Sequence, residues 1–392
     1  MTGFKLSSTV DRREEIESLV LSLSNSRKNV NYALIGPRQI GKTTILREVV
    51  QRLNDEGIIA VHLDFGVYRF APSEFSETLI RSLLQEYARK LGRVEKVFKK
   101  ANDLFGKLKG LKRVRPVFEV GPDQPPSILV HLESVEENPR EALELAFRYA
   151  SALAEESKRK VVVILDEFQH YVEFDSLPKL HGALDIFRAA IDSRGNVSYV
   201  VSGSRVHFLK EVLGGGKSPL FGRFTIVEVG NLEERYAKEL FREASPSMSE
   251  GRGEEEEAEE AYKIVGGHPF YLLALAEGRM MKKKGERGKE SIDETYERLL
   301  KSPTGSLNLY VKYILSEDLG SGVRGSRFVK ILRSLSSNPL KVSEISNATG
   351  IKLTNLPWYI GKLIDYDLVE KTGGEYSIKD RLVRDYFLNA SI

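Results

Sequence analysis

Short apolar runs alternate with longer amphipathic stretches along the first 235 residues of the chain. The runs are nearly uninterrupted and rich in β-branched residues, which is typical of strands buried on both faces of a parallel sheet. Between them, apolar residues recur every three or four positions, and this spacing predicts helices. The runs that predict strands are 32–35, 58–64, 161–165, 197–201 and 224–229. We therefore expect an α/β fold in which helices cover both faces of a parallel sheet.

The pattern changes to helices after residue 231. Toward the end of the chain it predicts helices at 328–335, 342–349 and 355–366, two short strands around a glycine turn at 372–374, and a last helix from Lys379. A helix-turn-helix followed by a hairpin is the element order of a winged-helix domain. The sequence thus predicts three parts: an α/β core (1–235), a helical lid domain (236–320) and a winged-helix domain (321–392).

A long insert of about 73–156 separates the second and third predicted strands. From Arg89 to Arg115 it holds eleven Lys and Arg residues and two acids, a net charge of +9. Apolar residues from Val94 to Leu108 recur at helical spacing, which predicts a basic helical insert with one apolar face. Its basic face is either the solvated side of a surface helix or a surface that binds nucleic-acid phosphates.

The amino-acid composition limits the kinds of partner, metal site and membrane contact that the protein can have. The 59 Lys and Arg against 56 Asp and Glu leave a net charge of +3, so overall charge indicates no partner. The absence of cysteine excludes disulfides, thiolate nucleophiles and cysteine-based metal sites. No apolar run approaches the roughly 20 residues that cross a bilayer, and the first residues lack the apolar core of a signal peptide. We expect a cytoplasmic protein without membrane contact.

The first predicted strand leads into a phosphate-binding loop. Residues 36–43 fit the pattern G-x-x-x-x-G-K-[ST], with a buried strand before them and an amphipathic helix after them. In such a loop backbone N–H groups curl around phosphate oxygens, and the helix N-terminus adds positive potential. Lys42 is expected to contact the β- and γ-phosphates, and Thr43 to bind Mg²⁺. The predicted nucleotide-binding residues of this segment are Gly36, Pro37, Arg38, Gln39, Ile40, Gly41, Lys42, Thr43 and Thr44.

A second motif agrees with the first. The apolar strand 161–165 ends in Asp166 and Glu167, and ligands gather at the carboxyl ends of strands in open α/β sheets. We predict that Asp166 holds Mg²⁺, directly or through water, and that Glu167 takes a proton from the attacking water. The two motifs predict an ATPase with ATP or ADP and Mg²⁺ as ligands. A guanine-reading Asn-Lys-x-Asp motif is absent, which favours ATP over GTP.

These motifs and several further boxes make the chain resemble the archaeal ATPase family, P-loop proteins related to the AAA+ and STAND ATPases. The resemblance covers nearly the whole length. The boxes are Val10-Asp11-Arg12, the phosphate loop, Asp166-Glu167-Phe168-Gln169, Val201-Ser202-Gly203-Ser204-Arg205, Pro219-Leu220-Phe221-Gly222-Arg223-Phe224, Gly266-Gly267-His268-Pro269-Phe270 and Tyr376-Ser377-Ile378-Lys379-Asp380. Phe221 stands where the family usually has tyrosine.

The resemblance implies roles for residues outside the two motifs. Val10 and Arg12 would lie near the adenine, and Pro269 would pack on the base. Ser204 would report the γ-phosphate, and Arg205 resembles a sensor arginine. Arg223 would be an arginine finger, in cis or from a neighbouring subunit, and would join Lys42 and Glu167 in catalysis; its alternative is a surface ion pair.

Two functions fit the sequence. In the first, ATP binding closes the lid and winged helix over the sheet and hydrolysis releases them, so the protein is a nucleotide-dependent switch with a protein partner. Hydrolysis would be slow without that partner, and the protein would be a monomer or a nucleotide-dependent oligomer. In the second, the winged helix and the basic insert bind nucleic acid and the protein is a DNA-associated ATPase. The predicted recognition helix, 354–366, carries few Arg or Lys residues, which favours the first hypothesis.

Overall fold

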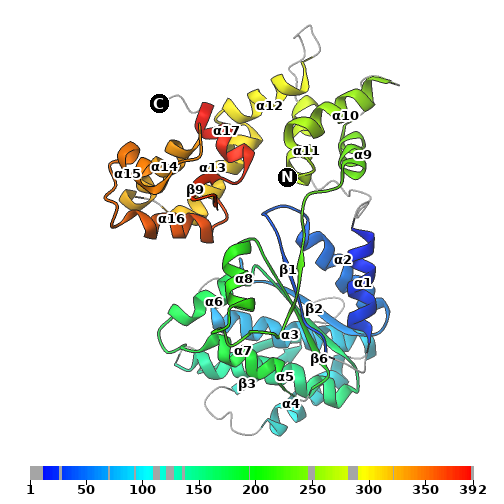
Figure 1. The fold of residues 1–392 in the computed structure, drawn as a ribbon. Helices are drawn as coiled ribbons and strands as arrows, with labels where there is room; N and C mark the ends of the chain where they lie inside the picture. Colours follow the sequence, from blue (N-terminus) through cyan, green and yellow to red (C-terminus); the bar gives the residue numbers. More distant parts are fainter. Residues whose placement is uncertain are drawn as a thin grey trace.

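The computed structural model of the 392-residue chain describes residues 12–25, 29–68, 71–91, 94–108, 115–120, 128–134, 137–193, 195–245, 252–280, 290–320 and 322–389. An α/β core and a helical part make up the molecule, and the helical part lies against the end of the core where the sheet strands finish (Figure 1). No helix in the described ranges is long and apolar enough to cross a membrane.

The core is built on a five-stranded parallel sheet in the order β2-β5-β6-β1-β7. Its strands are β1 (Tyr32–Ile35), β2 (Ile59–Asp64), β5 (Val161–Asp166), β6 (Val197–Gly203) and β7 (Thr225–Glu228). All five predicted strands are confirmed, with ends that differ by a residue or two. Every residue of β5 and β6 is buried, as nearly continuous apolar runs require.

Helices cover both faces of the sheet, which confirms the predicted α/β architecture. The core helices are α1 (Arg13–Ser24), α2 (Lys42–Asp55), α3 (Pro72–Leu91), α4 (Val94–Lys107), α5 (Pro139–Ser157), α6 (Gln169–Glu173), α7 (Ala183–Ile191) and α8 (Val206–Gly214), with a 3-10 helix at Phe174–Ser176. Successive strand residues face opposite sides. Leu34 therefore packs with α1 and α2, whereas its neighbours Ala33 and Ile35 belong to the larger cluster that includes α3, α5 and α7.

The insert contains a hairpin that the sequence did not predict. Between α4 and α5 the strands β3 (Arg115–Val120) and β4 (Ile128–Glu133) pair antiparallel, so the insert is not wholly helical. Ile128, Val130 and Leu132 are buried on one face of β4. This short alternation of buried and exposed residues follows a segment rich in Gly and Pro, and that composition predicts a loop rather than a strand. The amphipathic helix is confirmed as α4, because its Val97, Ala101 and Leu104 are buried.

The rest of the chain is mainly helical. The helical region (residues 234–319) comprises α9 (Glu234–Ala244), α10 (Arg252–Val265), α11 (Pro269–Met280), α12 (Ile292–Lys301) and α13 (Ser306–Leu319). The C-terminal module (residues 322–389) comprises α14 (Gly322–Leu335), α15 (Val342–Thr349), α16 (Leu356–Asp365), the hairpin β8 (Val369–Thr372) and β9 (Glu375–Ile378), and α17 (Arg381–Asn389). These elements follow the order expected of a winged helix.

The helical region and the C-terminal module share one hydrophobic cluster, which runs from Ala237 to Phe387. Polar contacts add to it: the Tyr296 hydroxyl donates to Asp385 at 3.0 Å, and the Tyr271 hydroxyl donates to Asp380 at 2.7 Å. The predicted boundary near residue 320 therefore separates two sets of elements that pack as one body. The division into lid and winged-helix domains stays a prediction.

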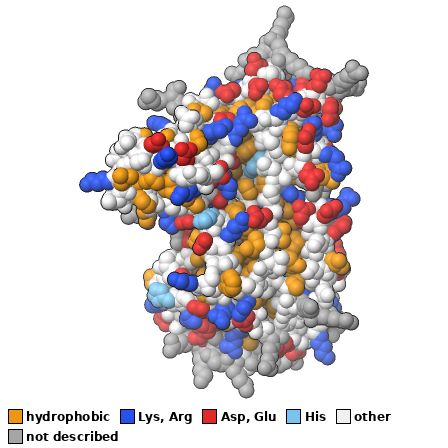
Figure 2. All heavy atoms as spheres, viewed as in Figure 1, with side chains coloured by type: hydrophobic (Ala, Val, Ile, Leu, Met, Phe, Trp, Pro, Cys, Tyr) orange, Lys and Arg blue, Asp and Glu red, His pale blue; other side chains and the backbone are white. Residues whose placement is uncertain are grey.

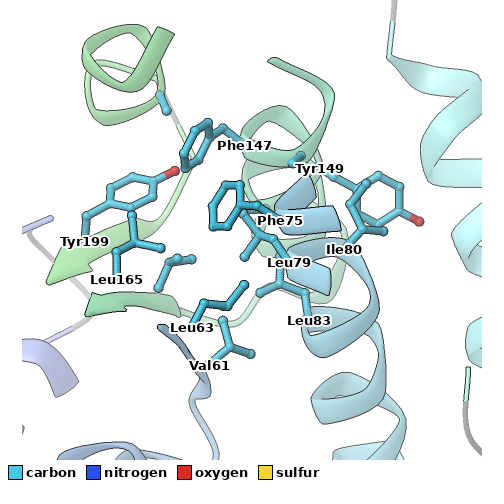
Figure 3. Close-up of a cluster of buried hydrophobic side chains, with 14 of the residues drawn as sticks. Val61, Leu63, Phe75, Leu79, Ile80, Leu83, Phe147, Tyr149, Leu165 and Tyr199 are labelled. Atoms are coloured by element: carbon cyan, nitrogen blue, oxygen red, sulfur yellow. The ribbon is translucent and has the colours of Figure 1, made fainter. Parts of the chain in front are cut away.

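Aromatic and aliphatic side chains fill the space between the sheet and the helices α3 and α5 (Figure 3). Phe147 of α5 lies at their centre, with its ring centroid 5.4 Å from that of Phe187 and 6.0 Å from those of Phe75 and Tyr199. Such aromatic pairs stabilise a core beyond the area that they bury.

We expect the substitution Phe147→Ala to lower the free energy of unfolding by about 3–5 kcal/mol, because it leaves a cavity among rings that cannot all collapse into it. Denaturant titration followed by circular dichroism measures this loss. The control is Leu21→Ala on α1, where the side chain is 79% exposed and the change should be within about 0.5 kcal/mol. Equal losses for the two variants would contradict the assignment of Phe147 to the core.

Candidate nucleotide site

The phosphate loop connects β1 to α2, and its two glycines are required for different reasons. Gly41 has φ 104°, a left-handed conformation that a side chain would strain. At Gly36 the limit is space, because a Cβ would lie 2.2 Å from the carbonyl oxygen of Val229. The loop is therefore held closely against the chain that leaves β7.

Lys42 begins α2 and bends back over the loop. Its Nζ donates hydrogen bonds to the carbonyl oxygens of Gly36 at 2.9 Å and Pro37 at 2.8 Å. The side chain is buried, and this burial lowers its pKa, while the nearby charges of Glu167 and Asp166 act in the opposite direction. These two hydrogen bonds thus hold the ammonium group of Lys42 against the backbone of the phosphate loop.

Asp166 ends β5 and is the most enclosed acid of the site, at 1% exposure. Thr43 donates to its Oδ2 at 2.6 Å, Ser202 donates to its Oδ1, and His62 Nε2 lies 3.4 Å from Oδ2. Burial alone would raise the pKa of Asp166, but the contacts with His62, Ser202 and Thr43 outweigh it and hold the pKa at about 2. The carboxylate is therefore ionised at neutral pH.

The Thr43 hydroxyl and the Asp166 carboxylate fit Mg²⁺, which prefers oxygen ligands. In the described parts of the chain, no group of three or more His, Cys, Asp or Glu side chains could hold a metal ion by itself. A magnesium ion bound here would therefore take its other ligands from phosphate oxygens and water, as is usual for this ion.

Glu167 follows Asp166 with φ 53°, and its carboxylate is held from one side. Its Oε2 accepts hydrogen bonds from the Ser204 hydroxyl at 3.0 Å and from Gln169 Nε2, and Gln169 also lies 3.4 Å from the Ser204 hydroxyl. The family resemblance predicts that Ser204 reports the γ-phosphate, and it places Gln169 in the box Asp166-Glu167-Phe168-Gln169 without a separate role. In the structure the Ser204 and Gln169 side chains contact Glu167.

The two other arginines with predicted roles, Arg205 and Arg223, pair with acids outside the phosphate loop. Arg205 pairs with Glu173 at 3.2 Å, and its guanidinium carbon lies 4.8 Å from the ring centroid of Tyr366 in the C-terminal module. Arg223 Nε lies 2.9 Å from Asp192, and its carbonyl oxygen accepts from Asn31, which precedes β1.

The phosphate loop follows the other end of β1, so Arg223 and the loop lie at opposite ends of that strand. In this conformation Arg223 pairs with Asp192 and does not line the cavity at the phosphate loop. A finger role for Arg223, in cis or in trans, stays a prediction.

The residues predicted near the base are only partly placed. Val10 lies outside the described residues. Arg12 donates to the carbonyl oxygen of Gly230 and lines a cavity of about 640 Å³. Pro269 begins α11, immediately after His268, whose Nε2 lies 3.2 Å from the carbonyl oxygen of Arg38 in the phosphate loop. Contact of Val10, Arg12 or Pro269 with adenine stays a prediction.

A sequence profile described as an ATPase domain predominantly from Archaea matches residues 9–275. The chain belongs to this archaeal ATPase family. The match spans the phosphate loop, Asp166, Glu167 and the start of α11. The resemblance inferred from the sequence boxes is therefore confirmed, and the protein is a P-loop ATPase of this family.

Two proteins of Methanocaldococcus jannaschii are similar in sequence. One, described as uncharacterized, is 23% identical over 240 residues, and the match covers 58% of this chain but only 48% of that protein. The other, described as an uncharacterized ATP-binding protein, is 21% identical over 309 residues, which covers 77% of this chain and 76% of the relative.

Solved structures share the fold. The Walker-type ATPase of Pyrococcus abyssi superposes with a TM-score of 0.60 at 22% identity, covering 97% of this chain and 96% of its own. The ORC2 protein of Aeropyrum pernix, solved as ADPNP and ADP complexes, gives 0.53 at 14% identity, with coverage of 100% and 97%.

In this archaeal ATPase the phosphate cavity contains residues that sequence analysis missed. The cavity measures about 570 Å³ and includes Asp64, His170, Tyr313 and Glu317 beside the loop and Glu167. Asp64 ends β2 as Asp166 ends β5, and the two are register partners, so the apolar strand before Asp64 was a usable signal. Tyr313 and Glu317 come from α13, far along the chain, and no local pattern indicates them.

His268 gives the contact between α11 and the phosphate loop a pH dependence. Burial lowers the pKa of His268 to about 4, against 6.5 for an ordinary histidine, although Asp380 and the Arg38 carbonyl favour the charged form. The unfolded chain therefore binds this proton first as pH falls. The contribution of neutral His268 to stability is present above pH 6.5 and is lost toward pH 4, by up to roughly 1.4 kcal/mol per pH unit.

We expect acidification from pH 7 to pH 4.5 to destabilise the wild-type protein more than the His268→Gln variant, which has no imidazole to protonate. Denaturant titrations at several pH values measure the free energy of unfolding of both. Parallel pH profiles would show that His268 does not contribute.

Proposed function

We propose that this archaeal ATPase is a switch that hydrolyses ATP slowly and transmits the nucleotide state to the helical region and the C-terminal module. One observation carries the proposal. The carbonyl oxygen of Arg38, inside the phosphate loop, lies 3.2 Å from His268 Nε2 and accepts from the Tyr310 hydroxyl at 3.3 Å. Phosphate entering the loop would therefore disturb contacts with α11 and α13.

A second link runs through the end of β6. Arg205 follows Ser204 and lies between Glu173 of the core and Tyr366 of the C-terminal module. Beside it, the backbone N–H of His207 donates to Asp367 at 3.2 Å. Ser204 contacts Glu167, so a movement of Glu167 would shift Ser204. The next residue, Arg205, contacts the C-terminal module and would shift with it.

The proposed chemistry assigns one task to each residue of the site. Lys42 and the loop N–H groups bind the phosphates, Thr43 and Asp166 hold Mg²⁺, and Glu167 accepts the proton of the attacking water. Bound magnesium would neutralise charge on the phosphate oxygens. Ser204 and Gln169 both donate to Oε2 of Glu167, and this restraint on the carboxylate supports slow turnover in the absence of a partner.

The substitution Glu167→Gln is expected to leave ATP binding intact and to lower kcat by about a hundredfold or more, since an amide cannot take the proton. Lys42→Ala should abolish or greatly weaken ATP binding, because it removes the buried ammonium. Calorimetric titration with ATP and a phosphate-release assay separate the two effects. Near-normal turnover of the Glu167→Gln variant would eliminate Glu167 as the base.

A second function, a DNA-associated ATPase, is favoured by the +9 charge between Arg89 and Arg115. Other features do not favour it. Lys362 is the sole Lys or Arg of α16, and on the face shown in Figure 2 acidic and basic side chains are interspersed. If this function holds, DNA raises the ATPase rate in low salt and the effect disappears in high salt. If the switch function alone holds, DNA changes the rate at neither salt concentration.

A further inference from the structure

His170 lines the phosphate cavity beside the phosphate loop. It lies on the short helix α6, three residues after Glu167, and its backbone N–H donates to the carbonyl oxygen of Glu167 at 3.0 Å. Lys42 and Glu167 line the same cavity. Since the lysine of a phosphate loop binds the β- and γ-phosphates, a γ-phosphate held by Lys42 would enter the space that His170 lines.

Glu173 orients the imidazole ring of His170. The Nδ1 atom of His170 lies 3.2 Å from Oε2 of Glu173. A carboxylate only accepts hydrogen bonds, so the hydrogen of this contact lies on Nδ1. In the charged ring both nitrogens donate. The negative charge of a bound γ-phosphate favours that form, in which Nδ1 donates to Glu173 and Nε2 to the phosphate.

The other carboxylate oxygen of Glu173 contacts Arg205. The two atoms, Oε1 and Nη1, lie 3.2 Å apart, and the side chains of Glu173 and Arg205 are 22% and 12% exposed. Water screens an ion pair in such a position less than a pair at the surface. On its far side, the guanidinium carbon of Arg205 lies 4.8 Å from the ring centroid of Tyr366. The phosphate cavity is thus linked to the C-terminal module by a relay of contacting side chains: His170, Glu173, Arg205 and Tyr366.

The relay ends where the C-terminal module meets the core. Arg205 is the N-cap of α8, Tyr366 is the C-cap of α16, and α16 packs against α8 (Figure 1). Next to this contact, the backbone N–H of His207 donates to Asp367 at 3.2 Å. Holding Arg205 against Tyr366 therefore supports docking of the module on the core.

We propose that His170 contacts the γ-phosphate of bound ATP and that the relay transmits this contact to Tyr366, so that ATP favours the docked C-terminal module more than ADP does. This role rests on the proposed switch function and names its γ-phosphate contact. The charged imidazole binds Glu173 more strongly than the neutral ring does. Glu173 is then held in place for Arg205, and Arg205 for Tyr366. With ADP the first contact of the relay is absent and docking is weaker.

The coupling is measurable from binding alone, because linkage between two equilibria is reciprocal. If the γ-phosphate favours docking, docking favours binding of the γ-phosphate by the same factor. Tyr366 is not among the described residues that line the phosphate cavity. Breaking its contact with Arg205 should nevertheless weaken the binding of β,γ-imido-ATP and leave ADP affinity nearly unchanged.

The test measures the affinity of the full chain for β,γ-imido-ATP and for ADP by calorimetric titration with Mg²⁺ present. His170→Ala should lower the ratio of the two association constants about tenfold, since it removes a hydrogen bond between charged groups. Tyr366→Ala and Glu173→Gln should each lower the ratio about threefold or more. The double variant of His170→Ala and Tyr366→Ala should give the same ratio as His170→Ala, because the relay is already broken.

Two matched variants are the controls. Tyr366→Phe keeps the aromatic ring beside Arg205 and should leave the ratio unchanged. His131→Ala, at an exposed histidine of β4, makes the same chemical change as His170→Ala outside the phosphate cavity and should also leave the ratio unchanged. Retained ADP affinity shows that each variant is folded.

Several results would overturn the inference. An unchanged ratio in His170→Ala, or equal losses of β,γ-imido-ATP and ADP affinity, would refute the γ-phosphate contact. Losses that multiply in the double variant would refute the relay. A wild-type chain that binds both nucleotides but releases no phosphate from ATP would refute the proposed hydrolysis alone, since the affinity ratio does not depend on turnover. A wild-type chain that binds neither nucleotide would refute both proposals.

Discussion

The arrangement of the site depends on the hydrogen bonds that the buried carboxylate of Asp166 accepts. An ionised group with 1% exposure is tolerated only when hydrogen-bond donors surround it. Here the donors are Thr43 of α2 and Ser202 of β6, and His62 Nε2 of β2 lies 3.4 Å from the carboxylate. The same charge therefore fixes the start of the helix after the phosphate loop and the ends of two strands beside β5.

Sequence was sufficient where chemistry follows directly from neighbouring residues. The phosphate loop needs glycines, Lys42 and Thr43 in one short segment, and the two acids stand at the end of an apolar strand, so both motifs can be recognised from neighbouring residues alone. The central strands β5 and β6 are continuous apolar runs because helices cover both of their faces, whereas β7 lies at the edge of the sheet and is largely exposed. The β3–β4 hairpin was missed because its apolar alternation is short and lies beside a Gly- and Pro-rich segment.

Residues brought to the site by tertiary packing were harder to predict. Tyr313 and Glu317 reach the phosphate cavity from a helix more than two hundred residues after the loop, and only the docking of the helical region places them there. Arg223 is the opposite case, because a local box suggested a site residue that the fold places away from the phosphate loop. Its box has the right composition and order, but its backbone leads into the amino end of β7, and the loop lies at the carboxyl end of β1. Its position along the strands therefore keeps Arg223 away from the phosphate cavity in this conformation, and its role as a finger stays a prediction.

The shared core of the helical region and the C-terminal module has a mechanical consequence. Closely packed interiors transmit strain. The elements that share the cluster from Ala237 to Phe387 should therefore move as one rigid body rather than as two independent domains. Its inner side contacts the carbonyl of Arg38 through His268, and contacts the core again through Tyr366 and Asp367, just before the hairpin β8–β9. A rotation too small to notice at the phosphates would be magnified along such a body.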